Sequence, residues 1–309
     1  MKHVCQRMLA CGALLLALGG AAQAEANQVR FARQLGLGYL QFYVMQDKRM
    51  LERAAERAGL GNVTASYAGM GTPTAITDAL LSGNVDIVGI GLPAFLTMWD
   101  KTRSGMNVRG MMAMNRQPAF LTTRNPNIKS IRDFTDNDRI ALPAPKVSVQ
   151  AIMLEMIAEK TLGKFDALDH LTVGMSHPDG TAAMLSGKLE ISSHFTSAPF
   201  QYQQLENPAI RKVLSSYDAT DGPNTFSAVA TLARWREANP KLYGAVRDAI
   251  LEANEFIAKM IADPEFSYAP EPENVMKIYG FMHKVGALKT MPATWQDLFF
   301  PEAHALKGN

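Results

Sequence analysis

The chain has 309 residues, of which 47% are hydrophobic and 19% charged, so it can bury a large core and is long enough for about two domains. This composition excludes a disordered chain. The formal net charge of only +2 argues against a nucleic-acid or anionic-membrane partner, because both favour a basic surface.

The N-terminus is typical of a secretory signal peptide. Lys2 and Arg7 precede an apolar run at residues 8–18, and Ala22-Gln23-Ala24 forms a small-residue cleavage signal. The run is shorter than the ~20 residues that a membrane-spanning helix needs. We therefore expect residues 1–24 to be a signal peptide and the protein to be periplasmic.

Cleavage after Ala24 would change two counts. Cys5 and Cys11 would be lost, so the mature chain would have no disulfide, thiolate nucleophile or cysteine metal site. Lys2 and Arg7 would also be lost, which leaves 29 basic against 29 acidic residues and a formal charge of zero.

Hydrophobic period and glycine or proline punctuation predict alternating strands and helices. In the first series we expect strands at residues 29–33, 63–68, 85–90 and 108–114, and helices at 39–58, 74–81 and 94–102. In the second we expect strands at 139–143, 171–175, 189–195 and 210–217, and helices at 148–162, 180–185 and from about 197. A strand at 224–233 and helices at 241–261, 273–285 and 295–300 follow. This alternation indicates an α/β fold with mostly parallel sheets flanked by helices.

One phrase occurs in both series. ALLSGNVDI begins at Ala79 and AMLSGKLEI begins at Ala183. Each copy predicts a helix that ends at a glycine, Gly83 or Gly187, which can adopt the left-handed conformation before the next strand. We interpret the repeat as a sign of two similarly built lobes. Such lobes create a cleft at the carboxyl ends of their strands, where open α/β sheets bind ligands.

Longer motifs carry a family resemblance. They are QLGLGYLQFYVM, ALLSGNVDI, RIALPAPKVSVQAIML, MSHPDGTAAMLSGKLEISSHFTSAPFQYQQL and PATWQDLFFPEAH. Together they resemble the solute-binding proteins of nitrate, sulfonate and taurine ABC importers, a group that is also similar to thiamine-pyrimidine synthases. The resemblance implies a type II periplasmic binding-protein fold, in which two lobes close over a small solute that an inner-membrane permease then receives.

The resemblance also implies the domain division. The chain would cross between lobes near residues 117–123 and 223–229. Lobe one would comprise residues 25–118 and 226–309, and lobe two residues 119–225, in a protein that acts as a monomer without a cofactor.

Candidate ligand residues lie where strands are expected to end and helices to begin, because free backbone N–H groups there favour an anion. The candidates are Gln34, Gly36, Tyr39, Thr72, Pro93, Ser148, Gln150, His194 and Thr196. Thr72 and Ser148 could equally be plain helix caps, and His194 could be a structural histidine.

Other functions have weaker support in the sequence. His177, Asp179, Glu190 and His194 could suggest a metal site, but Asp179 is expected to cap a helix, so we expect no metal. Motifs for zinc peptidases, α/β-hydrolases and P-loop enzymes are absent. The cysteine-rich motif of pyrimidine synthases has no counterpart in the mature chain, so we expect no enzyme. A thiamine-pyrimidine precursor binder and a sensor that docks on a receptor both stay open, as does the identity of the solute.

Overall fold

The structure is a computed structural model that describes residues 24–187, 190–261 and 267–309. The expected signal peptide therefore lies outside the described residues apart from Ala24, and so do Cys5, Cys11 and Leu189. None of the helices in the described ranges is long and apolar enough to cross a membrane.

Two five-stranded sheets form the framework of the described chain. The first has the order β2-β1-β3-β10-β4, and the second has the order β7-β6-β8-β5-β9. The strands of the first sheet are β1 (Gln28–Arg33), β2 (Thr64–Gly69), β3 (Ile87–Gly91), β4 (Val108–Arg116) and β10 (Thr225–Leu232). The strands of the second are β5 (Ala119–Thr123), β6 (Ile140–Leu142), β7 (Thr172–Gly174), β8 (Ser193–Ser197) and β9 (Arg211–Ser215).

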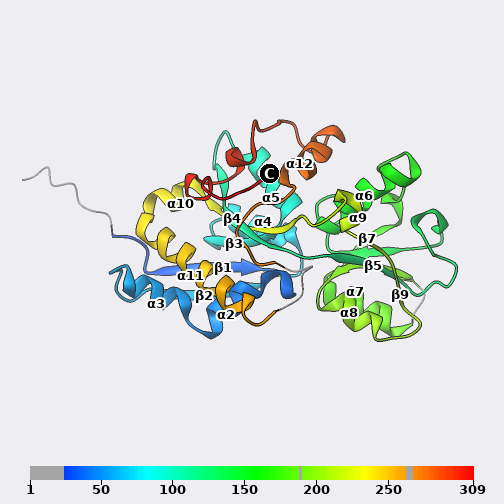
Figure 1. The fold of residues 1–309 in the computed structure, drawn as a ribbon, viewed down its shortest axis with the longest axis horizontal. Coiled ribbons are helices and arrows are strands. Elements are labelled where there is room, and N and C mark those ends of the chain that lie inside the picture. The colour runs from blue at the N-terminus through cyan, green and yellow to red at the C-terminus, as the bar shows by residue number, and fades with distance from the viewer. Residues whose placement is uncertain (1–23, 188–189, 262–266) are drawn as a thin grey trace, which may run out of the picture.

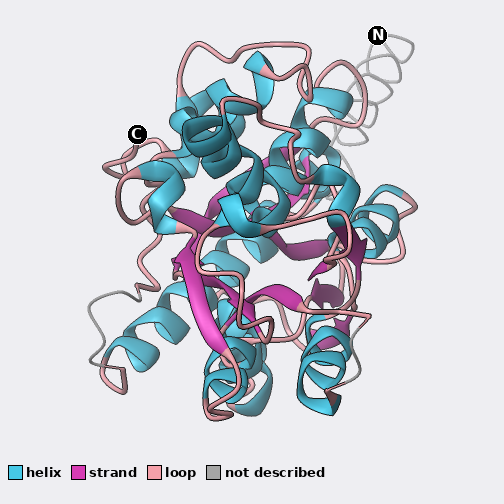
Figure 2. Cartoon of the chain, turned by 90° about the vertical axis from the view of Figure 1, so that its right-hand side faces the viewer, coloured by secondary structure: helices cyan, strands magenta, loops and turns pink. Residues whose placement is uncertain are grey.

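Helices cover both faces of the strands, as Figures 1 and 2 show. Those of the first half and the C-terminal part are α2 (Leu40–Asp47), α3 (Met50–Arg57), α4 (Pro73–Leu81), α5 (Leu92–Thr102), α10 (Ala233–Ala238), α11 (Pro240–Ala258) and α12 (Val275–Lys284). Those around the second sheet are α6 (Val149–Leu162), α7 (His177–Ser186), α8 (Phe200–Leu205) and α9 (Tyr217–Thr220). Short 3-10 helices include η1 (Leu37–Tyr39) and η3 (Asp169–Leu171). The two-lobed α/β fold predicted from the sequence is confirmed.

Each sheet contains one reversed strand. β10 pairs antiparallel with β3 and β4, and β5 pairs antiparallel with β8 and β9, while the other pairings are parallel. The chain passes from the first sheet to the second through residues 117–118 and returns through residues 216–224. In each case the reversed strand is therefore the first strand after the passage. Every residue of β3 and β10 is buried, because helices cover both faces of the sheet.

The repeated phrase occupies matching places in the two lobes. α4 lies between β2 and β3, and α7 lies between β7 and β8. Gly83 follows α4 with φ 77°, and Gly187 follows α7 with φ 74°. Both glycines thus adopt the left-handed conformation expected of them.

Several predicted elements differ from the structure. The helix expected at residues 295–300 is a short 3-10 helix at Trp295–Leu298. The helix expected over residues 39–58 is two helices, because Arg49 adopts a left-handed conformation with φ 48° and redirects the chain between α2 and α3. The strand expected at residues 189–195 is β8 at Ser193–Ser197, which pairs with β6 and β5. α7 begins at His177 rather than at residue 180, and its cap is Ser176, whose hydroxyl accepts the backbone N–H of Asp179. The expectation that Asp179 caps this helix was wrong.

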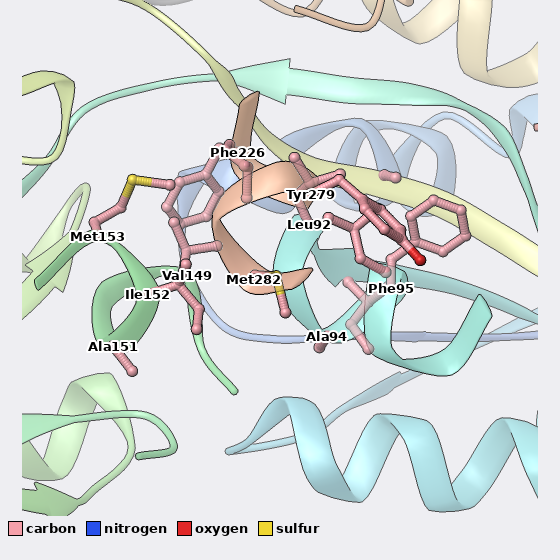
Figure 3. Packing of buried hydrophobic residues seen from close by; sticks show 14 of the residues in the cluster. Leu92, Ala94, Phe95, Val149, Ala151, Ile152, Met153, Phe226, Tyr279 and Met282 are labelled. Carbon is pink, nitrogen blue, oxygen red and sulfur yellow. The ribbon is translucent and has the colours of Figure 1, made fainter. Parts of the chain in front are cut away.

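An apolar cluster joins the two lobes. Figure 3 draws part of it, with Val149, Ile152 and Met153 of α6 on one side and Leu92 and Phe95 of α5 on the other. Phe226 of β10 belongs to the same buried cluster. Because these side chains come from elements of both sheets, burial of apolar surface holds the lobes together in this structure.

Candidate functional site

The carboxyl ends of the parallel strands in the two sheets face each other in three matched pairs. After β1 and β8, the backbone N–H of Leu37 donates to the carbonyl of Ala198 at 2.9 Å. After β2 and β7, a Cβ placed on Gly71 would lie 3.5 Å from Cβ of Ser176. The strand-end loops of the two lobes therefore meet at the edge of the sheets where α/β folds bind ligands.

The third pair is the tightest. A Cβ placed on Gly91, at the end of β3, would lie 3.0 Å from Cγ2 of Val149 at the start of α6, which follows β6. Only glycine fits this approach without a shift of the neighbouring side chain. The contact depends on closure, since the two residues belong to different lobes.

Four helices begin at these loops. Thr72 caps α4 by accepting the N–H of Ala75 at 3.2 Å, and Ser148 caps α6 by accepting the N–H of Ala151 at 3.3 Å. α5 and α7 begin at the loops after β3 and β7. Helix N-termini carry free N–H groups and a partial positive charge, so their convergence favours a negatively charged group in the cleft.

The lobe-one wall is built by the loop after β1. Gln34 and Tyr39 are both buried, and the Tyr39 hydroxyl donates to Oε1 of Gln34 at 3.0 Å. The Gln34 amide in turn donates to the carbonyl of Gly71 at 3.5 Å, which links two strand-end loops. Burial raises the pKa of Tyr39 above its usual range, so its hydroxyl stays protonated. Gly36, with φ 124°, faces the Ala198 carbonyl in a conformation that side chains rarely adopt.

Gln117 lies in the first passage between the sheets and carries the clearest unfilled hydrogen-bonding capacity. Its side chain is 1% exposed, and neither of its amide atoms has a hydrogen-bond partner. A Cβ on Gly38 would lie 2.6 Å from its Nε2, so Gln117 borders the same lobe-one loop. Buried amides are normally paired, and an unpaired one next to a cleft indicates a position where a ligand can bond. Gln117 was not among the predicted ligand residues, because no local sequence pattern marks it.

The lobe-two wall centres on His177, the first residue of α7. Its Nδ1 lies 2.8 Å from Oγ1 of Thr196, and its Nε2 lies 3.4 Å from Oγ of Ser197. Its ring stacks on Phe200 with centroids 5.7 Å apart. Burial lowers the pKa of His177 to about 4, so the imidazole is neutral near pH 7. A usable signal was its position three residues after the end of β7, at the start of a helix, but the sequence pattern suggested His177 only as a metal ligand.

The structure places His194 one layer below this wall. His194 is fully buried, and a Cβ on Gly180 in α7 would lie 2.6 Å from its ring. Its Nδ1 lies 2.6 Å from Nε2 of Gln204. Burial lowers the pKa of His194, so it too is neutral. His194 therefore packs against α7 at Gly180, and its Nε2 has no hydrogen-bond partner among the described residues. Its role toward a solute stays a prediction.

Of the remaining predicted residues, Pro93, Ser148 and Gln150 lie at helix starts and Thr196 lies in β8. Pro93 is buried in the first turn of α5. Gln150 is the second residue of α6, 2% exposed, and its Nε2 has no hydrogen-bond partner. Ser148 also donates from its hydroxyl to the carbonyl of Ala144 at 2.8 Å, so its side chain is already fully engaged. Thr196 contributes through its contact with His177.

Within residues 24–187, 190–261 and 267–309, no group of three or more His, Cys, Asp or Glu side chains could hold a metal ion. His177 is the first and Asp179 the third residue of α7, and Asp179 accepts a hydrogen bond from Ser176. The site is thus built from neutral hydrogen-bonding side chains and helix N-termini.

Several solved structures share the fold of this chain. The alkanesulfonate-binding protein SsuA from Xanthomonas axonopodis pv. citri, bound to MOPS, is 16% identical, with a TM-score of 0.62 over 86% of this chain and 81% of that one. The aliphatic sulphonate-binding protein SsuA from Escherichia coli is 14% identical, with a TM-score of 0.59 over 89% and 98%. The periplasmic nitrate-binding protein NrtA from Synechocystis PCC 6803 is 14% identical, with a TM-score of 0.59 over 92% and 73%. At these identities the likeness shows the fold.

The sequence itself gives the family. No curated protein sequence matches the chain. The profile of the NMT1-like family, however, matches residues 28–267, most of the chain and all ten strands of the two sheets. The suspected resemblance to solute-binding proteins of this group is confirmed at the level of family and fold, and the chain belongs to the NMT1-like family.

Proposed function

We propose that the protein is the exported solute-binding component of an ABC importer, which captures a small anionic solute between its lobes and delivers it to a permease. The observation that carries the proposal is the meeting of three pairs of strand-end loops, with four helices starting at the cleft. In this proposal residues 1–24 direct export to the periplasm. Residues 25–118 and 226–309 form lobe one, residues 119–225 form lobe two, and the protein acts as a monomer.

The mechanism is a shift in the population of open and closed forms. A solute that touches both walls, Gln34 and Tyr39 on one side and the His177 region on the other, stabilises the closed form by its extra contacts there. The helix starts at Thr72, Ser148 and Ser176 offer N–H groups to an anion such as a sulfonate, nitrate or carboxylate. The permease then recognises the closed form, and no chemical conversion is required.

A second candidate is an uncharged solute such as a thiamine-pyrimidine precursor. The observation that favours it is the chemistry of the walls, where the free amide atoms of Gln117 and Gln150 and a neutral His177 supply hydrogen bonds but no charge. A planar heterocycle with donors and acceptors would satisfy these groups. An enzyme of the pyrimidine-synthase type and a receptor-docking sensor lack a comparable observation among the described residues.

A thermal-shift screen tests the proposal and separates the two candidates. The purified chain is heated with taurine, methanesulfonate, nitrate, benzoate or an aminopyrimidine, because a ligand bound only by the native state raises its stability. At a concentration of about 100 times Kd the gain is about 2.7 kcal/mol. We expect an anion to raise the melting temperature. Stabilisation by the aminopyrimidine alone would favour the second candidate. If none of the compounds stabilises the protein, the proposed capture of a small solute is refuted.

Two variants place the binding site. Gln117→Ala removes the side-chain amide, whose nitrogen and oxygen both lack partners. It should weaken binding of the stabilising compound roughly tenfold, which corresponds to the loss of about one hydrogen bond. Gln203→Ala on the exposed side of α8 is the control and should bind like the natural protein. Equal affinity of both variants in calorimetry would remove Gln117 from the site.

A further inference from the structure

A cavity lies at the seam between the lobes, on the side of α12. It has a volume of about 370 Å³. Lobe one lines it with Thr97 and Lys101 of α5 and with residues 285–287 after α12. Lobe two lines it with Lys146, Val147, Glu155, Phe165, Asp166 and Asp169. Because both lobes form its walls, the cavity exists in this shape only while the lobes are closed.

Glu155 of α6 is the unusual group in this cavity. The residue is only 6% exposed, and none of the ion pairs between described residues includes its carboxylate. Burying an unpaired carboxylate is costly, because the charge loses its hydration without gaining a partner. Nothing in the solute cleft uses Glu155, so its isolation needs a separate explanation.

The charges around Glu155 do not compensate for this burial. Asp166 and Asp169 face it from the segment after α6, and they add repulsion. Lys146 is the nearest favourable charge, but its Nζ lies 3.8 Å from Oδ2 of Asp169 and is shared with that carboxylate. Lys101 of α5 lies across the cavity. The stretch after α12 contributes no titratable group, because residues 285–287 are Val, Gly and Ala.

The other elements packed against α6 add no further charged group to the cavity around Glu155. Glu159, one turn after Glu155, pairs with Lys284 of α12 at 2.9 Å across the seam. Asp221, after α9, is bonded by Lys160. Neither α9 nor the 3-10 helix at Ile131–Asp133 contributes a charged side chain to the cavity lining.

We propose that Glu155 is a proton-dependent latch, which in its neutral form favours the closed lobes and in its ionised form favours their opening. Burial, with repulsion from Asp169, raises the pKa of Glu155 from 4.5 to about 7 in the closed structure. Opening moves α5 and residues 285–287 away, so more water reaches the carboxyl and the burial contribution, the largest cause of the shift, falls. Asp166 and Asp169 belong to the same lobe as Glu155 and keep their repulsion, so its pKa falls only part of the way toward the ordinary value. The closed form therefore holds an extra proton between these values, and closure is favoured as the pH falls through 7.

This inference rests on the proposed function only in taking the closed lobes as the solute-holding form. Its test uses no solute. Asp78→Cys on α4 and Ala182→Cys on α7 place spin labels on exposed positions of the two helices that face each other across the cleft. No other cysteine is present after residue 24. Electron–electron dipolar spectroscopy then gives the ratio of closed to open molecules. From pH 5.5 to pH 8 the latch should lower this ratio, by roughly 25-fold at most for a carboxyl whose pKa changes fully.

The comparison with Glu155→Gln decides the outcome. This variant should stay closed at pH 8, because its amide mimics the neutral acid. The part of the change in the closed-to-open ratio with pH that comes from Glu155 should disappear. Glu206→Gln, at an exposed glutamate after α8 in the same lobe, is the matched control and should respond to pH like the natural protein. If Glu155→Gln does not fold, as judged by circular dichroism, Glu155→Ala replaces it. A response to pH that is the same with and without the Glu155 carboxyl would overturn the latch.

The solute screen separates this result from the proposed function. If the closed-to-open ratio depends on pH through Glu155 but no compound stabilises the protein, the latch is supported and the solute-binding proposal is contradicted. Stabilisation by a compound, combined with equal pH responses of the natural protein and Glu155→Gln, would do the reverse.

Discussion

Replacing Gly91 with alanine should open the lobes without unfolding either of them. Gly91 has φ −55° and ψ 140°, angles that alanine adopts freely, so the substitution adds no backbone strain. The added Cβ would lie 3.0 Å from Cγ2 of Val149, which belongs to α6 in the other lobe. The collision therefore exists in the closed form and disappears when the lobes separate.

The size of the effect follows from this distance. Adding a methylene to a well-packed contact costs about 1–3 kcal/mol. At 3.0 Å the neighbour must move by only a few tenths of an ångström, so we take about 1 kcal/mol, the lower end of that range. This amounts to roughly a fivefold fall in the ratio of closed to open molecules, and in affinity for a solute that requires closure.

The spin-label distance between α4 and α7 measures this ratio directly, and urea unfolding serves as the stability control. Gly91→Ala should shift the distances toward the open form, and adding Val149→Ala should remove the collision. The two substitutions should therefore be less than additive, as expected for residues in contact. An unchanged distance distribution in Gly91→Ala would show that the closed contact at the ends of β3 and β6 has been described wrongly.

Three further changes test the surroundings of the cleft. Gly180→Ala drives a Cβ to 2.6 Å from the His194 ring and should lower the free energy of unfolding by about 2 kcal/mol or more, whereas Gly244→Ala, a helical position with no atom within 4 Å, should leave it equal or higher in urea titration. Ser148→Ala removes a buried cap and should cost about 1 kcal/mol by the same assay; no loss would contradict the capping role. Burial lowers the pKa of His177 from 6.5 to about 4, so the unfolded chain binds the proton first as the pH falls. The histidine's contribution is present above pH 6.5 and should fall by about 2 kcal/mol at pH 5, and His177→Gln should lose less stability than the natural protein between pH 7 and pH 5.

The candidate site was predictable where it depends on strand ends. Gln34, Tyr39 and Thr72 follow predicted strands, and the structure brings Gln34, Tyr39 and Gly71 into one bonded set because parallel strands end at the same edge. Their role toward a solute stays a prediction. Gln117 was not predictable, since it lies in a passage between sheets and its importance comes from the absence of any partner for its amide.

His194 and His177 illustrate the opposite problem. His194 lies inside the strand predicted at residues 189–195, and His177 follows the strand predicted at residues 171–175 by two positions; the sequence favoured His194. Which of the two contacts a solute stays a prediction. The sequence could not show that the two rings lie close together, with centroids 5.9 Å apart, because α7 and β8 meet only in the fold.

The sequence alone determined the class of fold, because helix and strand periods, the glycine stops at Gly83 and Gly187 and the family motifs all act over short stretches of chain. It could not determine which loops meet, since that depends on how two sheets are docked by a shared apolar cluster and on the reversed strands β5 and β10. The seam cavity around Glu155 is the clearest case. Its residues come from α5, α6, the segment after α6 and the stretch after α12, and a carboxyl's ionisation is set by neighbours in space rather than by neighbours in sequence.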